Sequence, residues 1–257
     1  MPTRWKFTIE YNGSEYCGWQ RQDDVPTVQN EIEKAIESFS GQSVTLHVAG
    51  RTDAGVHARA QVAHADLQEF SKPMQPFEVA KAINAYLRPQ PISIILAQPV
   101  APDFEARYHA RGKHYRYRII NRYPFLALDK GYAWQVRKPL DTEAMRMAAT
   151  HLIGHHDFST FRDAECQAAS PEKTLDSIEI TELDYDGVGG KEFHFDVRGR
   201  SFLHHMVRNI VGSISLVGEG KWTPEDLKAA LDARDRTKGG PTAPAEGLYL
   251  MKVYYDE

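Results

Sequence analysis

The sequence predicts an α+β fold of two ferredoxin-like domains, in which antiparallel sheets carry helices in a βαββαβ order. Two observations lead to this prediction. Segments in which polar and apolar residues alternate, as in strands, take turns with segments whose apolar residues recur at helical spacing. The order of these segments in the first half of the 257 residues is repeated in the second half, with more irregular connections.

Six elements are expected in the first half. Alternation of polar and apolar residues predicts strands over 4–11, 43–49, 56–67 and 92–100. Thr27 can cap a helix whose apolar positions are Val28, Ile32, Ala35, Ile36 and Phe39. A second helix is marked by Phe77, Ala80, Ile83 and Leu87. Together these elements give the order βαββαβ.

The second half gives a similar pattern. Strands are expected over 114–121, 131–136, 174–186, 191–199 and 247–255. Helices are expected over 141–153 and 202–217, with a short one introduced by Thr223 and Pro224. We therefore expect one domain over residues 1–105 and another over 106–257, with the active site in a cleft between them.

Composition is that of an ordinary globular protein, with 42% hydrophobic and 26% charged residues. No apolar run reaches the roughly 20 residues that span a bilayer, and the N-terminus has no signal-peptide pattern, so we expect a cytoplasmic protein with no membrane association. The two cysteines, Cys17 and Cys166, are too few for a disulfide framework or a cysteine-rich zinc site.

A short motif, AGRTDAGVHA over residues 49–58, places Asp53 between Gly50 and Gly55. Asp-x-Gly is common in turns, where Asp bonds nearby backbone amides and Gly adopts positive φ, so a plain turn is one explanation. A turn does not require Arg51, whereas a catalytic carboxylate benefits from a cation that keeps it charged and fixes its rotamer. The motif makes Asp53 the candidate catalytic residue, with Arg51 as its partner.

Residues 106–122, ARYHARGKHYRYRIINR, form a basic segment without any acidic residue, although the net charge of the chain is −4. Its cations are Arg107, Arg111, Lys113, Arg116, Arg118 and Arg122. Tyrosines between arginines suit phosphate contact combined with base stacking, which favours RNA binding. A solvated basic strand is the alternative.

Residues 198–222 contain an apolar helical pattern whose other face offers His204, His205, Arg208 and Asn209. Adjacent histidines on a helix point about 100° apart, and no Glu or His stands at the i, i+4 spacing that helical zinc sites use, so no metal is expected. His155 and His156 are also adjacent and therefore also poor candidates for a metal site, and their position indicates the C-terminus of a helix. Arg208 is suited to a phosphate or a buried carboxylate.

Several contiguous motifs resemble the tRNA pseudouridine synthases of the TruA family, in the family order and from near residue 5 to near residue 255. They are YNGSEYCGWQRQ, AGRTDAGVHA, KHYRYRI, RSFLHHMVRNIVGS and APAEGLYL. The resemblance implies a homodimeric isomerase that converts uridine to pseudouridine at positions 38 to 40 of the tRNA anticodon stem-loop, without cofactor or metal.

The resemblance also implies particular site residues. Asp53 falls on the essential aspartate, Tyr115 on the tyrosine that contacts the target base, and Arg51 on the arginine that pairs with the aspartate and holds the cavity left by the flipped base. Apart from the resemblance, the basic segment and the helical face make Arg107, Arg111, Arg116, His204 and Arg208 the residues expected to bind the substrate. Leu248 is expected to line the apolar wall of the pocket, and a position in the core suits it equally well. The loop over 163–173 has no predicted role.

The chemistry is consistent with one ionised carboxylate. It can attack C1′, add to C6 of the uracil or remove the C2′ proton, and the sequence does not choose among these. The uridine must first leave the RNA stack, and Tyr115 can stack on it or relay the C5 proton. Two other classes compete. One is a non-catalytic RNA-binding module. The other is a hydrolase that uses Asp53 with His57 or His64, with or without a metal, but that lacks a second carboxylate at suitable spacing.

Overall fold

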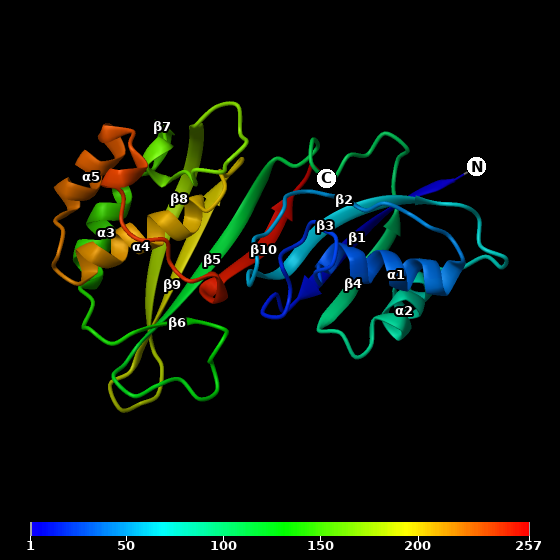
Figure 1. Cartoon of the computed structure of the whole chain (residues 1–257), viewed down its shortest axis with the longest axis horizontal. Coiled ribbons are helices and arrows are strands. Elements are labelled where there is room, and N and C mark those ends of the chain that lie inside the picture. The colour runs from blue at the N-terminus through cyan, green and yellow to red at the C-terminus, as the bar shows by residue number, and fades with distance from the viewer. Residues whose placement is uncertain (1, 257) are drawn as a thin grey trace. The chain divides into compact units, whose positions relative to one another are not determined.

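The computed structural model describes residues 2–256 and shows an α+β protein with a large mixed sheet (Figure 1). Backbone contacts divide the chain into two units. Unit 1 extends to Arg111 and also contains the segment from Leu250 onward, whereas unit 2 is Gly112–Tyr249. This division differs from the boundary expected after residue 105 in two ways: the first boundary falls after Arg111, and most of the final strand belongs to the first unit.

Unit 1 has the expected βαββαβ order, which confirms that part of the prediction. Its elements are β1 (Thr3–Tyr11), α1 (Val28–Ser40), β2 (His47–Val48), β3 (His57–Leu67), α2 (Pro76–Leu87) and β4 (Ile92–Pro99). Strand β1 pairs antiparallel with both β3 and β4, and β2 pairs antiparallel with β3. Figure 1 shows α1 and α2 running side by side, in agreement with their packing contacts.

Strand β2 is much shorter than the strand expected over 43–49, and side chains of α1 explain why. Glu33 Oε1 accepts the backbone N–H of Leu46 at 2.8 Å, and the Gln29 amide lies 3.4 Å from the Leu46 carbonyl. Both polar groups of Leu46 are therefore satisfied without a strand partner. The second expected helix is confirmed as α2, with Ala80, Ile83 and Leu87 buried, but Phe77 is 68% exposed and Val79 takes the buried position of that turn.

Unit 2 contains the remaining elements. They are β5 (Gly112–Asn121), β6 (Trp134–Val136), α3 (Thr142–Thr150), β7 (Gly154–Asp157), β8 (Glu172–Asp184), β9 (Lys191–Gly199), α4 (Met206–Gly218) and α5 (Pro224–Ala233). Strand β10 (Leu248–Tyr254) contains the second boundary between the units. The antiparallel order is β5-β9-β8-β7, but β6 runs parallel to β5, so the sheet is mixed rather than purely antiparallel as expected.

Three expectations for unit 2 need correction. The helix expected over 202–217 begins only at Met206, because His205 adopts a left-handed conformation with φ 58°. The helix expected over 141–153 ends at Thr150, and the segment expected to be its C-terminus is strand β7, which pairs with β8. The long β8–β9 hairpin is confirmed. Within residues 2–256, no helix combines the length and apolar character needed to cross a membrane.

Candidate active site

The loop that carries Asp53 joins β2 to β3 in unit 1 and is closed by local hydrogen bonds. The side-chain amide of Gln61 donates to the carbonyl of Gly50 at 2.8 Å, which ties the start of the loop to β3. The backbone N–H of Val56 donates to the carbonyl of Asp53 at 3.2 Å, and Gly55 has φ 78°. The turn expected from Asp-x-Gly is confirmed, and Asp53 is its first residue.

A second loop, residues 12–19, packs directly on the Asp53 loop. The backbone N–H of Trp19 donates to the carbonyl of Thr52 at 3.0 Å, and the N–H of Gly55 donates to the carbonyl of Tyr16 at 3.3 Å. These two bonds hold the residues immediately before and after the Asp-Ala pair. The backbone that carries the Asp53 side chain is therefore held in place by a loop, residues 12–19, that is distant in sequence.

Two glycines make this close packing possible. A Cβ on Gly18 would lie 2.7 Å from the carbonyl oxygen of Thr52, and Gly18 also has φ 88°. A Cβ on Gly13 would lie 2.0 Å from the carbonyl oxygen of Val56. Both contacts are with backbone atoms, so a side chain at either position would displace the Asp53 loop. Sequence reasoning noted this stretch only as part of a family motif, although its glycines were a readable signal.

Exposure alternates along the three central residues of the motif. Thr52 is buried, and its hydroxyl lies 2.7 Å from the Tyr11 hydroxyl, which anchors the loop to β1. Burial raises the pKa of Tyr11 to about 12, so this phenol stays neutral. Asp53 is half-buried and Arg51 is exposed. Among residues 2–256, Arg51 forms no ion pair, so the expected pairing with Asp53 is not seen in this structure.

The two histidines of the hydrolase alternative have structural hydrogen bonds. His57 is 2% exposed, and its Nδ1 accepts the backbone N–H of Gly13 at 3.1 Å. His64 is equally buried, its Nδ1 accepts the N–H of Ala106 at 3.2 Å, and burial lowers its pKa. A ring nitrogen that accepts a backbone N–H cannot also act as the general base. These contacts argue against a hydrolase that pairs Asp53 with His57 or His64.

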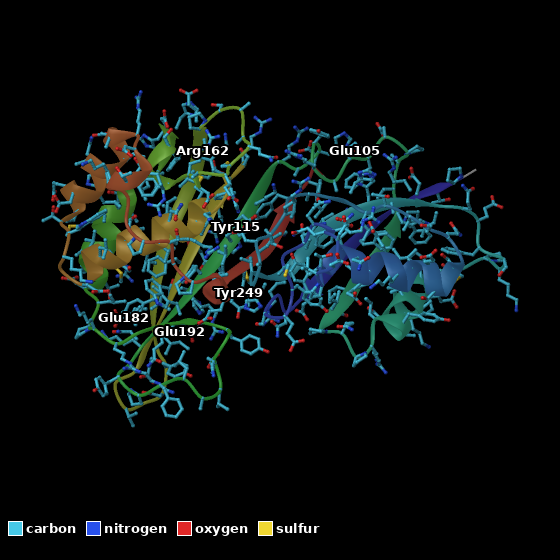
Figure 2. The ribbon with its side chains drawn as sticks, in the orientation of Figure 1. Glu105, Tyr115, Arg162, Glu182, Glu192 and Tyr249 are labelled. Atoms are coloured by element: carbon cyan, nitrogen blue, oxygen red, sulfur yellow. The ribbon has the colours of Figure 1, made fainter. Side chains whose placement is uncertain are left out.

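Strand β5 positions Tyr115 in unit 2. Tyr115 and Tyr117 share the buried face of this strand, as alternation predicts. Tyr117 is fully buried, and its hydroxyl donates to the Pro244 carbonyl at 2.7 Å, so this ring is part of the core. Tyr115 is 8% exposed, and the edge-to-face contact of its ring with Phe202 has a centroid distance of 4.9 Å. Figure 2 marks Tyr115 on β5.

The basic segment is largely neutralised by acidic residues from other parts of the chain. The ion pairs are Arg111 with Asp256 (2.7 Å), Arg116 with Asp196 (3.0 Å), Arg118 with Glu192 (2.7 Å) and Arg122 with Asp186 (3.4 Å). Figure 2 labels Glu192 among these partners. Arg107 is exposed, lies 5.8 Å from the ring of Tyr108, and forms no ion pair within residues 2–256.

Asp196 on β9 is the most buried of these acidic partners. The residue is 6% exposed. Its carboxylate accepts hydrogen bonds from Arg116 Nε and Nη2, both at 3.0 Å, and also lies 2.5 Å from His114 Nε2. Burial opposes ionisation of this carboxyl, but the bonds from His114 and Arg116 outweigh it and lower the pKa of Asp196 to about 2. Arg116 therefore has a structural partner that the sequence segment did not reveal.

The other expected RNA-binding residues are all in unit 2. His204 precedes α4 in the chain rather than lying on it, and His205 caps the helix. Arg208 is half-buried, and its Nε donates to the Ala243 carbonyl at 2.8 Å. Leu248, the first residue of β10, is 5% exposed, which fits its core interpretation.

Comparison with known proteins identifies the family. A model of the tRNA pseudouridine synthase family matches residues 8–109 and 148–256. The chain is 52% identical to the tRNA pseudouridine synthase A of Rhodopseudomonas palustris strain HaA2, over 99% of this chain and 100% of that protein. It is also 52% identical to the tRNA pseudouridine synthase A of Paramagnetospirillum magneticum, over 99% of this chain and 96% of that protein.

The chain therefore belongs to the tRNA pseudouridine synthase family, as the motifs indicated. Among solved structures, it is similar to a chain of a Cbf5-Nop10-Gar1 complex, with 10% identity, a TM-score of 0.33, and coverage of 95% of this chain and 57% of that one. That likeness is too weak to bear on fold or function.

Proposed function

We propose that this chain isomerises uridine to pseudouridine at positions 38 to 40 of the tRNA anticodon stem-loop, with Asp53 as the catalytic residue. The observation that carries the proposal is the Asp53 loop, whose backbone is fixed by residues 12–19 while its carboxylate side chain is only half-buried. Catalysis is lost when the reactive carboxylate is misplaced by about 1 Å, so the reaction requires that the backbone carrying this carboxylate be fixed.

The reaction breaks the bond between C1′ and N1 of the uracil, turns the base, and joins C1′ to C5. Attack on C1′, addition to C6 and removal of the C2′ proton all remain open to the Asp53 carboxylate. The overall change is an isomerisation without net oxidation or hydrolysis, so it requires neither a redox cofactor nor a metal-activated water. The C5 proton leaves at the end, and we assign its transfer to the Tyr115 hydroxyl or to water bound through it.

We assign Arg51 to the substrate rather than to a permanent ion pair. Its side chain is exposed, and it forms no ion pair within the described residues 2–256. A free guanidinium two residues before Asp53 is available for a phosphate, or for the space that the flipped base leaves in the RNA. Arg107, His204 and Arg208 are proposed to contact the RNA backbone. Arg111 is proposed to do so as well, because its ion pair with Asp256 is exposed on both partners and therefore weak. Arg116 and Leu248 are proposed to act mainly through the structure that they support.

The resemblance also supports proposals about the oligomeric state and the cellular location. A homodimer is expected, and sedimentation equilibrium would then give twice the 29.1 kDa mass of the chain. A tRNA substrate is consistent with the cytoplasmic location that the sequence suggests.

Release of tritium from bulk tRNA that carries C5-labelled uridine tests the proposed function. The isomerase replaces the C5 hydrogen and therefore releases tritium while the RNA strand stays intact. A binding module releases none, and a hydrolase cleaves the strand or frees the base. Stoichiometric tritium release with intact RNA is the expected result, and an absence of release would overturn the proposal.

A further inference from the structure

Two segments of unit 2 that are distant in sequence meet immediately before α4. One is residues 162–166, the start of the loop to which the sequence gave no role, and the other is residues 203–205. Arg162, labelled in Figure 2, begins the first segment, and its guanidinium donates to the carbonyl of Cys166. The two segments are joined by hydrogen bonds that converge on Asp163 and on the two adjacent histidines.

His205 has an unusual backbone conformation for a residue with a side chain. It caps α4 with φ 58° and ψ 3°, in the left-handed region that favours glycine. It is one of only three non-glycine residues with positive φ within residues 2–256. Its carbonyl accepts the N–H of Asn209 at 2.9 Å, so the turn sets the start of the helix. Such a conformation persists only where neighbouring groups compensate for its cost.

Asp163 is a residue that makes contacts with this turn. Its carboxylate Oδ2 lies 2.6 Å from His205 Nδ1, its Oδ1 lies 3.7 Å from His204 Nδ1, and its backbone N–H donates to the His204 carbonyl at 3.1 Å. One aspartate thus contacts the backbone of the turn and both of its rings. The two rings lie against each other with a centroid distance of 4.0 Å, so fixing one restrains the other.

Asp163 is itself held in place by its own loop. Its Oδ1 accepts the backbone N–H of Glu165 at 2.9 Å, and its carbonyl accepts the N–H of Cys166 at 3.1 Å. The Cys166 Sγ in turn accepts the N–H of His204 at 3.4 Å. Burial opposes ionisation, but the bonds from Glu165 and His205 lower the pKa of Asp163. Both of its oxygens are occupied within unit 2, so this carboxylate is suited to orienting other groups rather than to reacting.

We propose that Asp163 is a positioning residue for tRNA binding, which keeps the His204–His205 turn in its left-handed conformation and thereby presents His204 and Arg208 to the RNA backbone. This inference rests on the proposed function. It gives the 162–166 loop a purpose that neither the motifs nor the family model supplies. Because the groups it positions bind the substrate rather than react with it, loss of Asp163 should affect KM more than kcat.

The first test is Asp163→Ala, assayed by tritium release from labelled bulk tRNA. We expect KM to rise about tenfold, with kcat changed by less than about twofold. Asp235→Ala is the matched control, since Asp235 accepts the N–H of Thr237 in a similar local turn but does not contact the histidines. The control should keep the wild-type KM. A wild-type KM for Asp163→Ala would overturn the proposal.

A second test separates positioning from a general loss of stability. Glycine adopts positive φ without cost, so the turn in a His205→Gly protein needs no carboxylate to hold it. In that background, Asp163→Ala should raise KM by less than about twofold, which makes the two changes strongly non-additive. Equal effects of Asp163→Ala in both backgrounds would contradict the proposal.

Asp163→Asn decides the question if Asp163→Ala does not fold, because it keeps the size of the side chain and removes its charge. It should raise KM severalfold, and a wild-type KM would again overturn the inference. Wild-type protein assayed in parallel distinguishes the two levels of the argument. If wild-type protein releases no tritium, the proposed function fails. If wild-type protein is active and all Asp163 variants match it, only this inference fails.

Discussion

The Asp53 loop and the basic strand β5 hold their side chains in opposite ways. Around Asp53, the restraints are backbone hydrogen bonds and two glycines, and Asp53 is the first residue of a turn that the motif itself encodes. Along β5, the restraints are ion pairs between side chains, and the acidic partners of Arg116 and Arg118 come from up to 80 residues away in the sequence. The first region fixes the backbone under its carboxyl group, whereas the second pairs most of its arginines with acidic side chains.

This difference determines what the sequence can reveal about each region. A turn is a local structure, so the order Asp-Ala-Gly predicts it directly. Charge neutralisation depends on which strand lies alongside, and Arg116 faces Asp196 only because of the β5–β9 register. A dense run of arginines in the sequence therefore does not by itself predict a positively charged surface, because acidic residues from other strands can neutralise it. Within the described residues of the basic segment, Arg107 is the arginine that forms no ion pair.

Tyr115 is the side chain on β5 whose change should affect turnover most. If its hydroxyl takes part in the final proton transfer, Tyr115→Phe should bind tRNA nearly normally and turn over about a hundredfold or more slowly. Tyr115→Leu should additionally weaken binding if the ring stacks on the base. Single-turnover rates and filter-binding affinities measure the two effects. A Phe variant with the wild-type rate would assign Tyr115 to stacking alone.

Gly18→Ala tests whether backbone packing positions Asp53. The added methyl group would meet the Thr52 carbonyl at 2.7 Å, so the loop must move, and we expect turnover to fall about tenfold or more with tRNA affinity retained. Gly41→Ala is the matched control, because Gly41 also has positive φ, at 70°, but has no atom within 4 Å of the added Cβ. It should lose about 1 kcal/mol of stability and keep its activity. Equal activities of the two variants would contradict the positioning argument.

Arg107 and Arg116 should differ if ion pairing, rather than position in the basic segment, decides which cations bind RNA. Arg107→Ala should weaken tRNA binding severalfold for every tRNA species and reduce the salt slope by about 1. Arg116→Ala should leave that slope unchanged, since its guanidinium already binds Asp196. Affinities measured over a range of salt concentrations give both slopes. An unchanged slope for Arg107→Ala would leave this segment without a role in phosphate contact.

The ion pair of Arg116 should instead appear in stability. Asp196 has a pKa of about 2 in the folded protein against the ordinary 3.8, a shift equivalent to about 2 kcal/mol. Because the folded pKa is the lower one, this stabilisation is present above about pH 4 and is lost as the pH falls to about 2. Urea denaturation should therefore show Arg116→Ala destabilised by about 1 to 3 kcal/mol at pH 7 and by less at pH 3.

Arg59→Ala provides the control for that experiment, because the Arg59–Glu10 pair is exposed on both sides, at 62% and 41%. Such pairs contribute little, so its effect should be under about 1 kcal/mol at both pH values. A destabilisation by Arg116→Ala that does not depend on pH would show that packing, not the charge of Asp196, accounts for its effect.

Local sequence patterns predicted most elements, and the exceptions have identifiable tertiary causes. The βαββαβ order of unit 1 and the β8–β9 hairpin followed from alternation and helical spacing. The expected strand over 43–49 shrank to two residues because Glu33 and Gln29, on a helix, bind the backbone of Leu46. The helix expected from residue 202 begins only at Met206 because His205 is left-handed, a conformation that spacing alone does not encode.

In the candidate site, too, the local features were predicted from the sequence and the tertiary contacts were not. The Asp53 turn was predicted from its own residues, and Tyr115 occupies the buried strand face that alternation indicated. The clamp formed by residues 12–19 was not predicted, because a hydrogen bond from Trp19 to Thr52 joins loops separated by a helix and a strand. The ion pair expected between Arg51 and Asp53 is not observed among residues 2–256. That expectation relied on proximity in sequence, which does not fix where two side chains point.

The most direct test of the central claim is pseudouridine formation by Asp53→Asn, measured in a single turnover with enzyme in excess over tRNA. The amide preserves the size of the side chain but is neither a nucleophile nor a base, so tRNA affinity should stay within severalfold of wild type and no pseudouridine should form. Asp53→Glu should also be nearly inactive, because it moves the carboxylate by about 1 Å. Appreciable pseudouridine formation by Asp53→Asn would contradict the account.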